Sequence, residues 1–156
     1  MKSTDVLNMM DPRHALFGLF FAFNNRLQAA GDGFYEEITC KQFFLMACIH
    51  LFEDEPPTAN DLAKVMGCTR QNVKEILVSL EKKGFIAFKP HKTDKRKRMV
   101  VLTPKAIKTA QKYTAKENEF LGLLYNGVSD EEVKNAYLFM AKLEDNLKKI
   151  TGEVKE

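Results

Sequence analysis

The chain has 156 residues, the length of one ordinary domain, so we expect a single compact unit or one protomer of an oligomer. Its composition, 45% hydrophobic and 29% charged, is that of a globular protein and excludes disordered and fibrous chains. The longest apolar run, residues 15–23, has about half of the roughly 20 residues that a membrane-spanning helix needs. Asp5 and Asp11 precede this run, which is unlike a signal peptide, and we expect a cytoplasmic protein without a membrane partner.

The net charge of +3 is small, but it is unevenly distributed along the chain. Residues 89–98, KPHKTDKRKR, contain six basic side chains and one acidic side chain, a local charge of +5. The other 146 residues contain 18 basic and 20 acidic side chains and therefore have a net charge of −2. A weakly acidic body thus has one concentrated basic segment, the kind of patch that attracts polyanions.

The N-terminal third contains the start and stop signals of two helices. Asp11-Pro12 is an N-cap followed by a first-turn proline, and it predicts a helix over 12–30 that a glycine-rich segment ends. Thr39, with a glutamine three residues later, forms a capping box for a second helix. Acidic residues and two prolines follow position 52, so this helix should end near there.

The next segment predicts two short helices that are joined by a tight turn. Thr58 is the N-cap of a helix that ends at Gly67. Thr69 is the N-cap of another helix, which runs to about Lys83 and is closed by Gly84.

After these helices the pattern changes from helical to extended. The segments 85–89 (FIAFK) and 98–102 (RMVVL) are rich in β-prone residues and flank the basic loop, so they predict a hairpin with a charged tip. Helices capped at Thr103 and Ser129 should then run to about Tyr125 and Thr151. The predicted fold is mainly α with one small β-hairpin, in the α+β class.

Residues 58–77, TANDLAKVMGCTRQNVKEIL, have the spacing of a helix-turn-helix. Ala63 is small where two helices must approach closely, and Gly67 accepts the positive φ that the turn requires. The buried stripe predicted between the helices consists of Leu62, Val73, Ile76 and Leu80. Any helical hairpin needs such residues, so this pattern alone gives about even odds of a DNA-binding motif.

The predicted second helix of this pair exposes residue types that suit base readout near its N-terminal end. Arginine can bond guanine through two hydrogen bonds, and asparagine or glutamine can bond adenine. Recognition helices present this end to the major groove. The candidate contacts are Thr69, Arg70, Gln71, Asn72 and Lys74.

The charged hairpin directly after this helix makes a winged helix the better explanation of both patterns. A charge run by itself is usually a solvated surface. At the tip of a hairpin beside a recognition helix, it can instead follow phosphates or enter a minor groove. The candidate wing contacts are Lys92, Lys95, Arg96, Lys97 and Arg98.

Two segments resemble the multiple-antibiotic-resistance regulator (MarR) family of dimeric winged-helix proteins. They are DLAKVMGCTRQNVKEILVSLEKKGFI at 61–86 and DKRKRMVVLTPKA at 94–106, and the order of elements is similar from about 12 to 150. The resemblance implies that Asp94 orients the wing, that Arg96 reaches the DNA and that residues 69–74 meet the major groove. It also implies pairing through the terminal helices and release of DNA by a small, commonly aromatic ligand. Two features depart from the family pattern: Phe88-Lys89 replaces a frequent arginine, and the wing is richer in lysine.

The last predicted helix has an apolar seam at alternating steps of three and four residues. This seam is too short for an autonomous coiled coil and needs a partner surface. The first helix is apolar nearly all around, which favours a partner beyond the intramolecular core. The candidate dimerisation residues are Leu16, Phe17, Phe20, Val133, Met140, Leu143, Leu147 and Ile150. Within one domain over 1–156, we expect a DNA-binding lobe at 39–103 and dimerisation helices at 12–30 and 104–151.

Catalytic and metal-binding patterns are missing from the sequence. The three histidines are scattered, the three cysteines lack ligand spacing, and no phosphate loop or nucleophile elbow is present, so we expect no enzyme, metal or cofactor. Cys40 is the one candidate redox sensor, because the dipole at a helix start lowers a thiol pKa. A buried inert thiol is the favoured alternative. Tyr113 and Glu117 form an i, i+4 pair that we interpret as structural.

The sequence therefore predicts a homodimeric, sequence-specific regulator that binds double-stranded DNA at a pseudo-palindromic operator. We expect it to repress transcription and to be released by a small aromatic effector. The alternatives are a winged helix used for protein contact, a nonspecific architectural DNA binder and a thiol-dependent enzyme at Cys40.

Overall fold

The structure, a computed structural model, describes residues 9–52 and 54–152. The elements of this part of the chain are α2 (Pro12–Asp32), α3 (Cys40–His50), α4 (Ala59–Met66), α5 (Arg70–Lys82), β1 (Ile86–Pro90), β2 (Arg98–Leu102), α6 (Pro104–Leu124) and α7 (Asp130–Ile150). The mainly α fold with one antiparallel hairpin is confirmed. The described helices are not apolar enough over a sufficient length to cross a bilayer. Two compact units divide between Glu117 and Asn118, and each is described by itself.

Side-chain caps set the helix starts that the sequence predicts. Thr39 and Gln42 make both hydrogen bonds of a capping box at α3, and Ser129 does the same with Glu132 at α7. Thr58 forms a further capping box with Asp61 at α4, where only the threonine was predicted as a cap. The Thr58 hydrogen bonds lower the pKa of the Asp61 carboxyl below its usual value.

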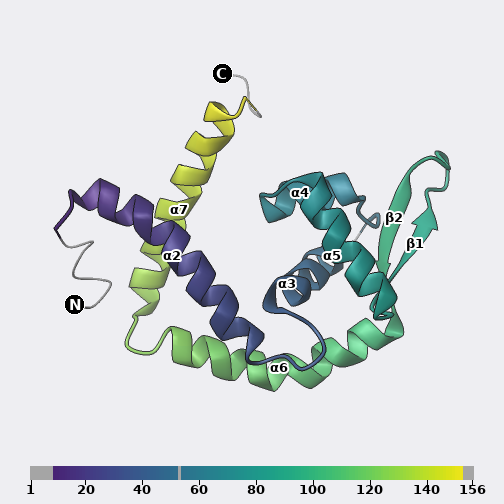
Figure 1. Ribbon diagram of the computed structural model, residues 1–156, viewed down its shortest axis with the longest axis horizontal. Helices are drawn as coiled ribbons and strands as arrows, with labels where there is room; N and C mark the ends of the chain where they lie inside the picture. The colour runs from purple at the N-terminus through teal and green to yellow at the C-terminus, as the bar shows by residue number, and fades with distance from the viewer. Residues whose placement is uncertain (1–8, 53, 153–156) are drawn as a thin grey trace. The chain divides into compact units, whose positions relative to one another are not determined.

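The first unit contains one hydrophobic core, which α3, α4, α5 and the hairpin share. In Figure 1 the three helices lie together, and the β1–β2 hairpin projects beside α5. Side chains with no exposed surface come from all of these elements: Leu45, Leu62, Val73, Leu80, Phe85 and Val100. The stripe of α5 differs by one position from the prediction, because Leu77 is 1% exposed whereas Ile76 is only partly buried.

A polar contact links α3 to α5 inside this unit. Gln42 is 8% exposed, and its amide nitrogen donates to the Ser79 hydroxyl at 2.9 Å. The Lys83 ammonium donates to the amide oxygen of Gln42 at 3.1 Å and to the Glu37 carbonyl at 2.7 Å. Since buried polar groups are costly unless they are hydrogen-bonded, these bonds fix the relative position of the two helices.

The first half of α6 packs on the segment between α2 and α3. Tyr113 is 1% exposed, and its hydroxyl accepts a hydrogen bond from the Glu36 amide at 3.0 Å. The Glu36 carboxylate lies 3.0 Å from Lys112 Nζ and 3.3 Å from Lys116 Nζ. These contacts agree with the structural interpretation of Tyr113.

The second unit consists of the end of α6, a turn at Gly127 and α7. Gly127 has a φ of 78°, which glycine adopts without strain. None of the described side chains of α7 is buried. Large apolar side chains on it are exposed instead, among them Val133, Tyr137, Met140, Leu147 and Ile150.

Candidate nucleic-acid interface

The turn between α4 and α5 is a glycine-dependent helix-turn-helix, as the spacing predicts. Gly67 has a φ of 60° and a ψ of 33°, the left-handed conformation that lets the chain leave α4 sharply. The Cys68 amide donates to the Ala63 carbonyl at 3.1 Å and closes the turn. Thr69 then caps α5 by accepting a hydrogen bond from the Asn72 amide at 3.2 Å. The buried faces of Leu62 and Val73 hold the two helices together.

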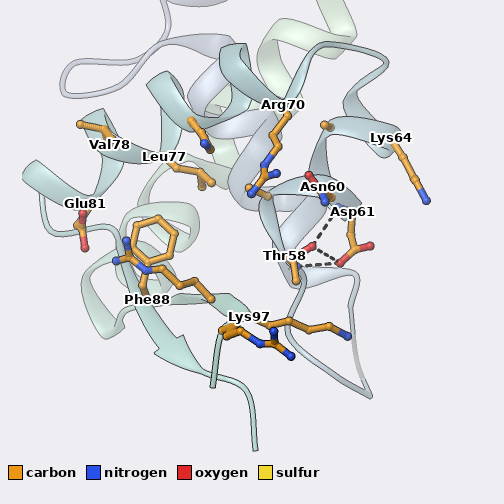
Figure 2. A pocket seen from close by; sticks show the side chains of 15 residues that line it. Thr58, Asn60, Asp61, Lys64, Arg70, Leu77, Val78, Glu81, Phe88 and Lys97 are labelled. Atoms are coloured by element: carbon orange, nitrogen blue, oxygen red, sulfur yellow. Dashed lines mark hydrogen bonds between the residues drawn. The ribbon is translucent and has the colours of Figure 1, made fainter. Parts of the chain in front are cut away.

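The N-terminal end of α5 is open to solvent. Arg70, Gln71, Asn72 and Lys74 are all exposed there, as the candidate recognition surface requires. Gln71 donates to Glu75 on the same helix at 3.2 Å, and Arg70 extends from α5 into a hollow beside Thr58 and Asn60 (Figure 2). The surface therefore offers arginine, amide and ammonium donors on one turn of helix, the types that read base edges.

The wing, residues 86–102, is a regular hairpin with a closed tip. Its strands pair from Ile86 with Leu102 to Pro90 with Arg98. The Lys97 amide donates to the Asp94 carbonyl at 2.9 Å, and the Arg96 amide donates to the Asp94 carboxylate at 3.1 Å. Asp94 thus caps the turn, while the Arg96 side chain is 95% exposed.

One cation of the wing lies on an aromatic ring. The Arg98 guanidinium carbon is 4.1 Å from the ring centre of Phe88, two positions away on the opposite strand. A guanidinium on a ring face has a cation–π attraction of about 0.5–1 kcal/mol at an exposed site. Phe88, where the resembled family frequently has arginine, therefore holds the Arg98 cation near the groove.

A hollow of about 880 Å³ lies between α4, α5 and the wing, and we call it the cationic groove. Its basic lining residues are Lys64, Arg70, Lys74, Arg96, Lys97 and Arg98. Its acidic lining residues are Asp61 and Glu81, and the Asp61 carboxylate is already bonded to the Thr58 amide and hydroxyl at 2.9 and 2.7 Å. In Figure 2 Phe88 and Lys97 of the wing lie across from α5.

The groove brings together five of the predicted contact residues and leaves the others outside it. Arg70, Lys74, Arg96, Lys97 and Arg98 line it. Thr69, Gln71, Asn72, Lys92, Asp94 and Lys95 are not among its lining residues. Sequence reasoning missed Thr58, Asn60, Lys64, Glu81 and Phe88. A bridge between Met99 of β2 and Thr58 brings the start of α4 beside the wing. Thr58, Asn60 and Lys64 therefore line the groove together with residues of the wing.

Cys40 lies at the first position of α3, as predicted, but the pKa of its thiol is raised and not lowered. Its amide donates to the Asp32 carboxylate at 2.6 Å. Burial, Asp32 and Glu117 raise the pKa of the Cys40 thiol above its usual value. A Cβ at Gly31 would lie 2.5 Å from the Cys40 sulfur, so the thiol packs closely against that glycine. The raised pKa is opposite to the lowering on which the redox-sensor hypothesis for Cys40 depends.

The predicted dimerisation residues leave much apolar surface exposed in the single chain. Exposed fractions are 64% for Phe17, 36% for Val133, 48% for Met140, 54% for Leu147 and 79% for Ile150. Leu16, Phe20 and Leu143 are half-buried. Apolar patches of this kind mark interaction surfaces.

The fold and the groove define the class of the molecule, a winged helix-turn-helix with a basic concave face. Residues 38–97, which include α3, α4, α5 and β1, match the model of the MarR family. The resemblance predicted from the sequence is confirmed over these residues, which match the MarR family in sequence and in fold.

Solved structures of several proteins share this fold. Staphylococcus aureus MepR in a complex with DNA is 25% identical, with a TM-score of 0.74, and the match covers 83% of this chain and 95% of MepR. A MarR protein from Peptoclostridium difficile is 18% identical, with a TM-score of 0.78 and coverage of 99% and 96%. Bordetella bronchiseptica BpsR, whose DNA binding is regulated by 6-hydroxynicotinic acid, is 18% identical, with a TM-score of 0.71 and coverage of 82% and 91%.

Proposed function

We propose that this protein is a cytoplasmic, sequence-specific DNA-binding repressor that acts as a homodimer on a pseudo-palindromic operator. The observation that carries the proposal is the cationic groove, where six basic side chains face a hollow between a recognition helix and a wing. Duplex DNA is the polyanion that such a concave, helix-bearing surface fits. The DNA complex of MepR, 25% identical over most of both chains, supports the same reading.

Two energetic roles divide between α5 and the wing in this proposal. Arg70, Gln71 and Asn72, at the start of α5, would contact base edges in the major groove. The wing cations would contact phosphates, which supply affinity without sequence information. Arg96, 95% exposed at the wing tip, has the reach for an adjacent minor groove.

The exposed apolar side chains of α2 and α7 favour a second copy of the chain as partner. Phe17, Met140, Leu147 and Ile150 are each about half exposed or more within one chain. Burying such side chains against an identical surface stabilises a two-fold dimer. A dimer presents two recognition helices to half-sites about one DNA turn apart, which predicts a pseudo-palindromic operator.

The proposal also includes release of the protein from DNA when a small aromatic molecule binds. BpsR, which has the same fold, binds DNA under the control of 6-hydroxynicotinic acid. A ligand that binds the free conformation more tightly than the DNA-bound one lowers DNA affinity by its differential affinity for the two.

Selection from a pool of duplexes with a randomised core tests the DNA-binding proposal. We expect the enriched sequences to share a two-fold symmetric pattern with half-sites about 10 base pairs apart. Affinity without a shared pattern would favour the architectural alternative, and no affinity at low salt would favour the protein-contact alternative.

Salt dependence then tests the role of the wing. If a dimer contacts roughly 6 to 10 phosphates, its affinity should fall by about 10³ to 10⁵ between 50 and 200 mM salt. Lys95→Ala should reduce this slope, whereas Lys134→Ala, an exposed lysine change on α7, should leave it unchanged. A flat response of the unmodified protein would contradict the phosphate-binding role.

A further inference from the structure

His91 is the first residue after β1, and its side chain is 17% exposed at the base of the wing loop. Its ring contacts two parts of the chain. On one side, Nδ1 lies 3.2 Å from the Thr93 amide and 3.1 Å from the Asp94 amide. On the other side, Nε2 lies within hydrogen-bonding distance of the Glu55 carboxylate, in the segment that leads to α4.

These contacts favour one arrangement of the ring hydrogens. Backbone amides only donate, so the Thr93 and Asp94 amides are satisfied when Nδ1 accepts. The Thr93 hydroxyl, 3.1 Å from Nδ1, can then donate to it as well. In this arrangement Nε2 carries the hydrogen and donates it to Glu55.

We propose that His91 is a positioning residue for DNA binding, because its ring joins the wing loop at Nδ1 and Glu55 at Nε2. The inference rests on the proposed DNA-binding function and adds a residue that acts through the wing cations. Closing the loop at Thr93 and Asp94 fixes the turn from which Arg96 and Lys97 enter the groove. Tying the loop to Glu55 holds that turn beside the start of α4.

A second set of contacts holds β2 to the segment before α4, so we expect His91 to affect the position of the wing tip and not the folding of the lobe. The Val100 amide donates to the Pro57 carbonyl at 2.8 Å, and Met99 forms a bridge with Thr58. These bonds secure the base of β2 without the imidazole. Substitution of His91 should therefore move the wing tip while the core around Val100 remains intact.

Two substitutions separate the two contacts of the ring. His91→Asn keeps an acceptor oxygen near the Nδ1 position but does not reach Glu55. His91→Gln keeps a donor that reaches toward Glu55 but lacks the acceptor for the two amides. His50→Gln, at the exposed end of α3, is the matched control for losing a histidine elsewhere.

The test measures fluorescence anisotropy of a labelled mixed-sequence duplex of about 30 base pairs, which holds two half-sites. At low salt and one constant pH near 8, His91→Asn and His91→Gln should each bind about threefold to tenfold more weakly than wild type, because each loses one of the two contacts of the ring. His50→Gln should bind like wild type. Affinity equal to that of wild type in both His91 variants would overturn the proposal.

Nitrogen NMR of the free protein separates this inference from the DNA-binding proposal. Near pH 8, the His91 ring should show Nε2 protonated and Nδ1 unprotonated, and Glu55→Ala should shift the Nε2 resonance. The opposite tautomer would overturn the role of His91 even if DNA binds. If the predicted tautomer is found but no duplex binds at low salt, the proposed function fails and the positioning role for DNA fails with it.

Discussion

The winged-helix lobe and α7 have opposite relations between sequence and burial. In the lobe, Leu62, Val73, Leu80 and Phe85 have no exposed surface. In α7, none of the described side chains is buried, although the helix has a capping box and an apolar seam. The lobe thus buries its hydrophobic residues within one chain, whereas α7 leaves them exposed. Capping therefore sets where a helix begins, but the burial of its apolar side chains depends on the surfaces around it.

The strongest test of this contrast removes a buried side chain from the lobe. Leu80→Ala should lower the free energy of unfolding by about 2–5 kcal/mol, because it leaves a cavity in the buried core. Leu147→Ala on α7 is the matched change at a side chain that is 54% exposed. Chemical denaturation of both variants at a fixed protein concentration gives the comparison, and equal losses at low concentration would contradict it.

The next test breaks the proposed seam of α7. Met140→Asp combined with Leu147→Asp should raise the dimer dissociation constant by about 100-fold or more, because charges replace apolar side chains in a contact between copies. Analytical ultracentrifugation measures the change, and circular dichroism should show that helix content is retained. A wild-type protein that is monomeric at micromolar concentration would remove the dimer from the proposal.

Within the lobe, a smaller effect separates base readout from phosphate contact. Arg70→Ala should reduce discrimination at one base pair by about 1–3 kcal/mol, whereas Lys95→Ala should weaken all sequences alike. Competition between the selected operator and a random duplex measures the difference. Equal losses on both duplexes for Arg70→Ala would contradict a readout role.

The smallest effect concerns the cap of α4. Thr58→Ala should cost about 0.5–2 kcal/mol of stability, because it removes the hydroxyl that caps the Asp61 amide. The folded-state pKa of Asp61 is lowered, so its contribution is present above its unfolded pKa of about 4 and is lost as pH falls through the folded value. Thermal unfolding between neutral and acidic pH should therefore show a weaker acid dependence in Asp61→Asn, and an unchanged slope would contradict this linkage.

Local chemistry made most of the lobe predictable. Thr39, Thr69 and Gly67 act through neighbours three or four residues away, so their roles can be read from spacing alone. The predicted buried stripe of α5 was wrong at one position, because Leu77 is buried and Ile76 is only partly buried. Apolar residues occupy both positions, and only the packing of the folded lobe decides which of them is buried.

Contacts between distant segments could not be predicted in the same way. The groove takes Thr58 and Asn60 from before and within α4 and Phe88 from the wing, and sequence spacing does not bring these together. The raised pKa of the Cys40 thiol also depends on the fold, because burial is its largest cause and Asp32 and Glu117 act on the thiol through space.

Thr58 takes part in two structural contacts at the same time. Its hydroxyl caps α4, and its backbone forms a bridge with Met99 at the base of the wing. We therefore expect a change in the tilt of the wing to displace the first turn of α4 as well. The wing and α4 should then contact each half-site without moving relative to one another. An operator with altered half-site spacing would have to be accommodated by a change outside the lobe.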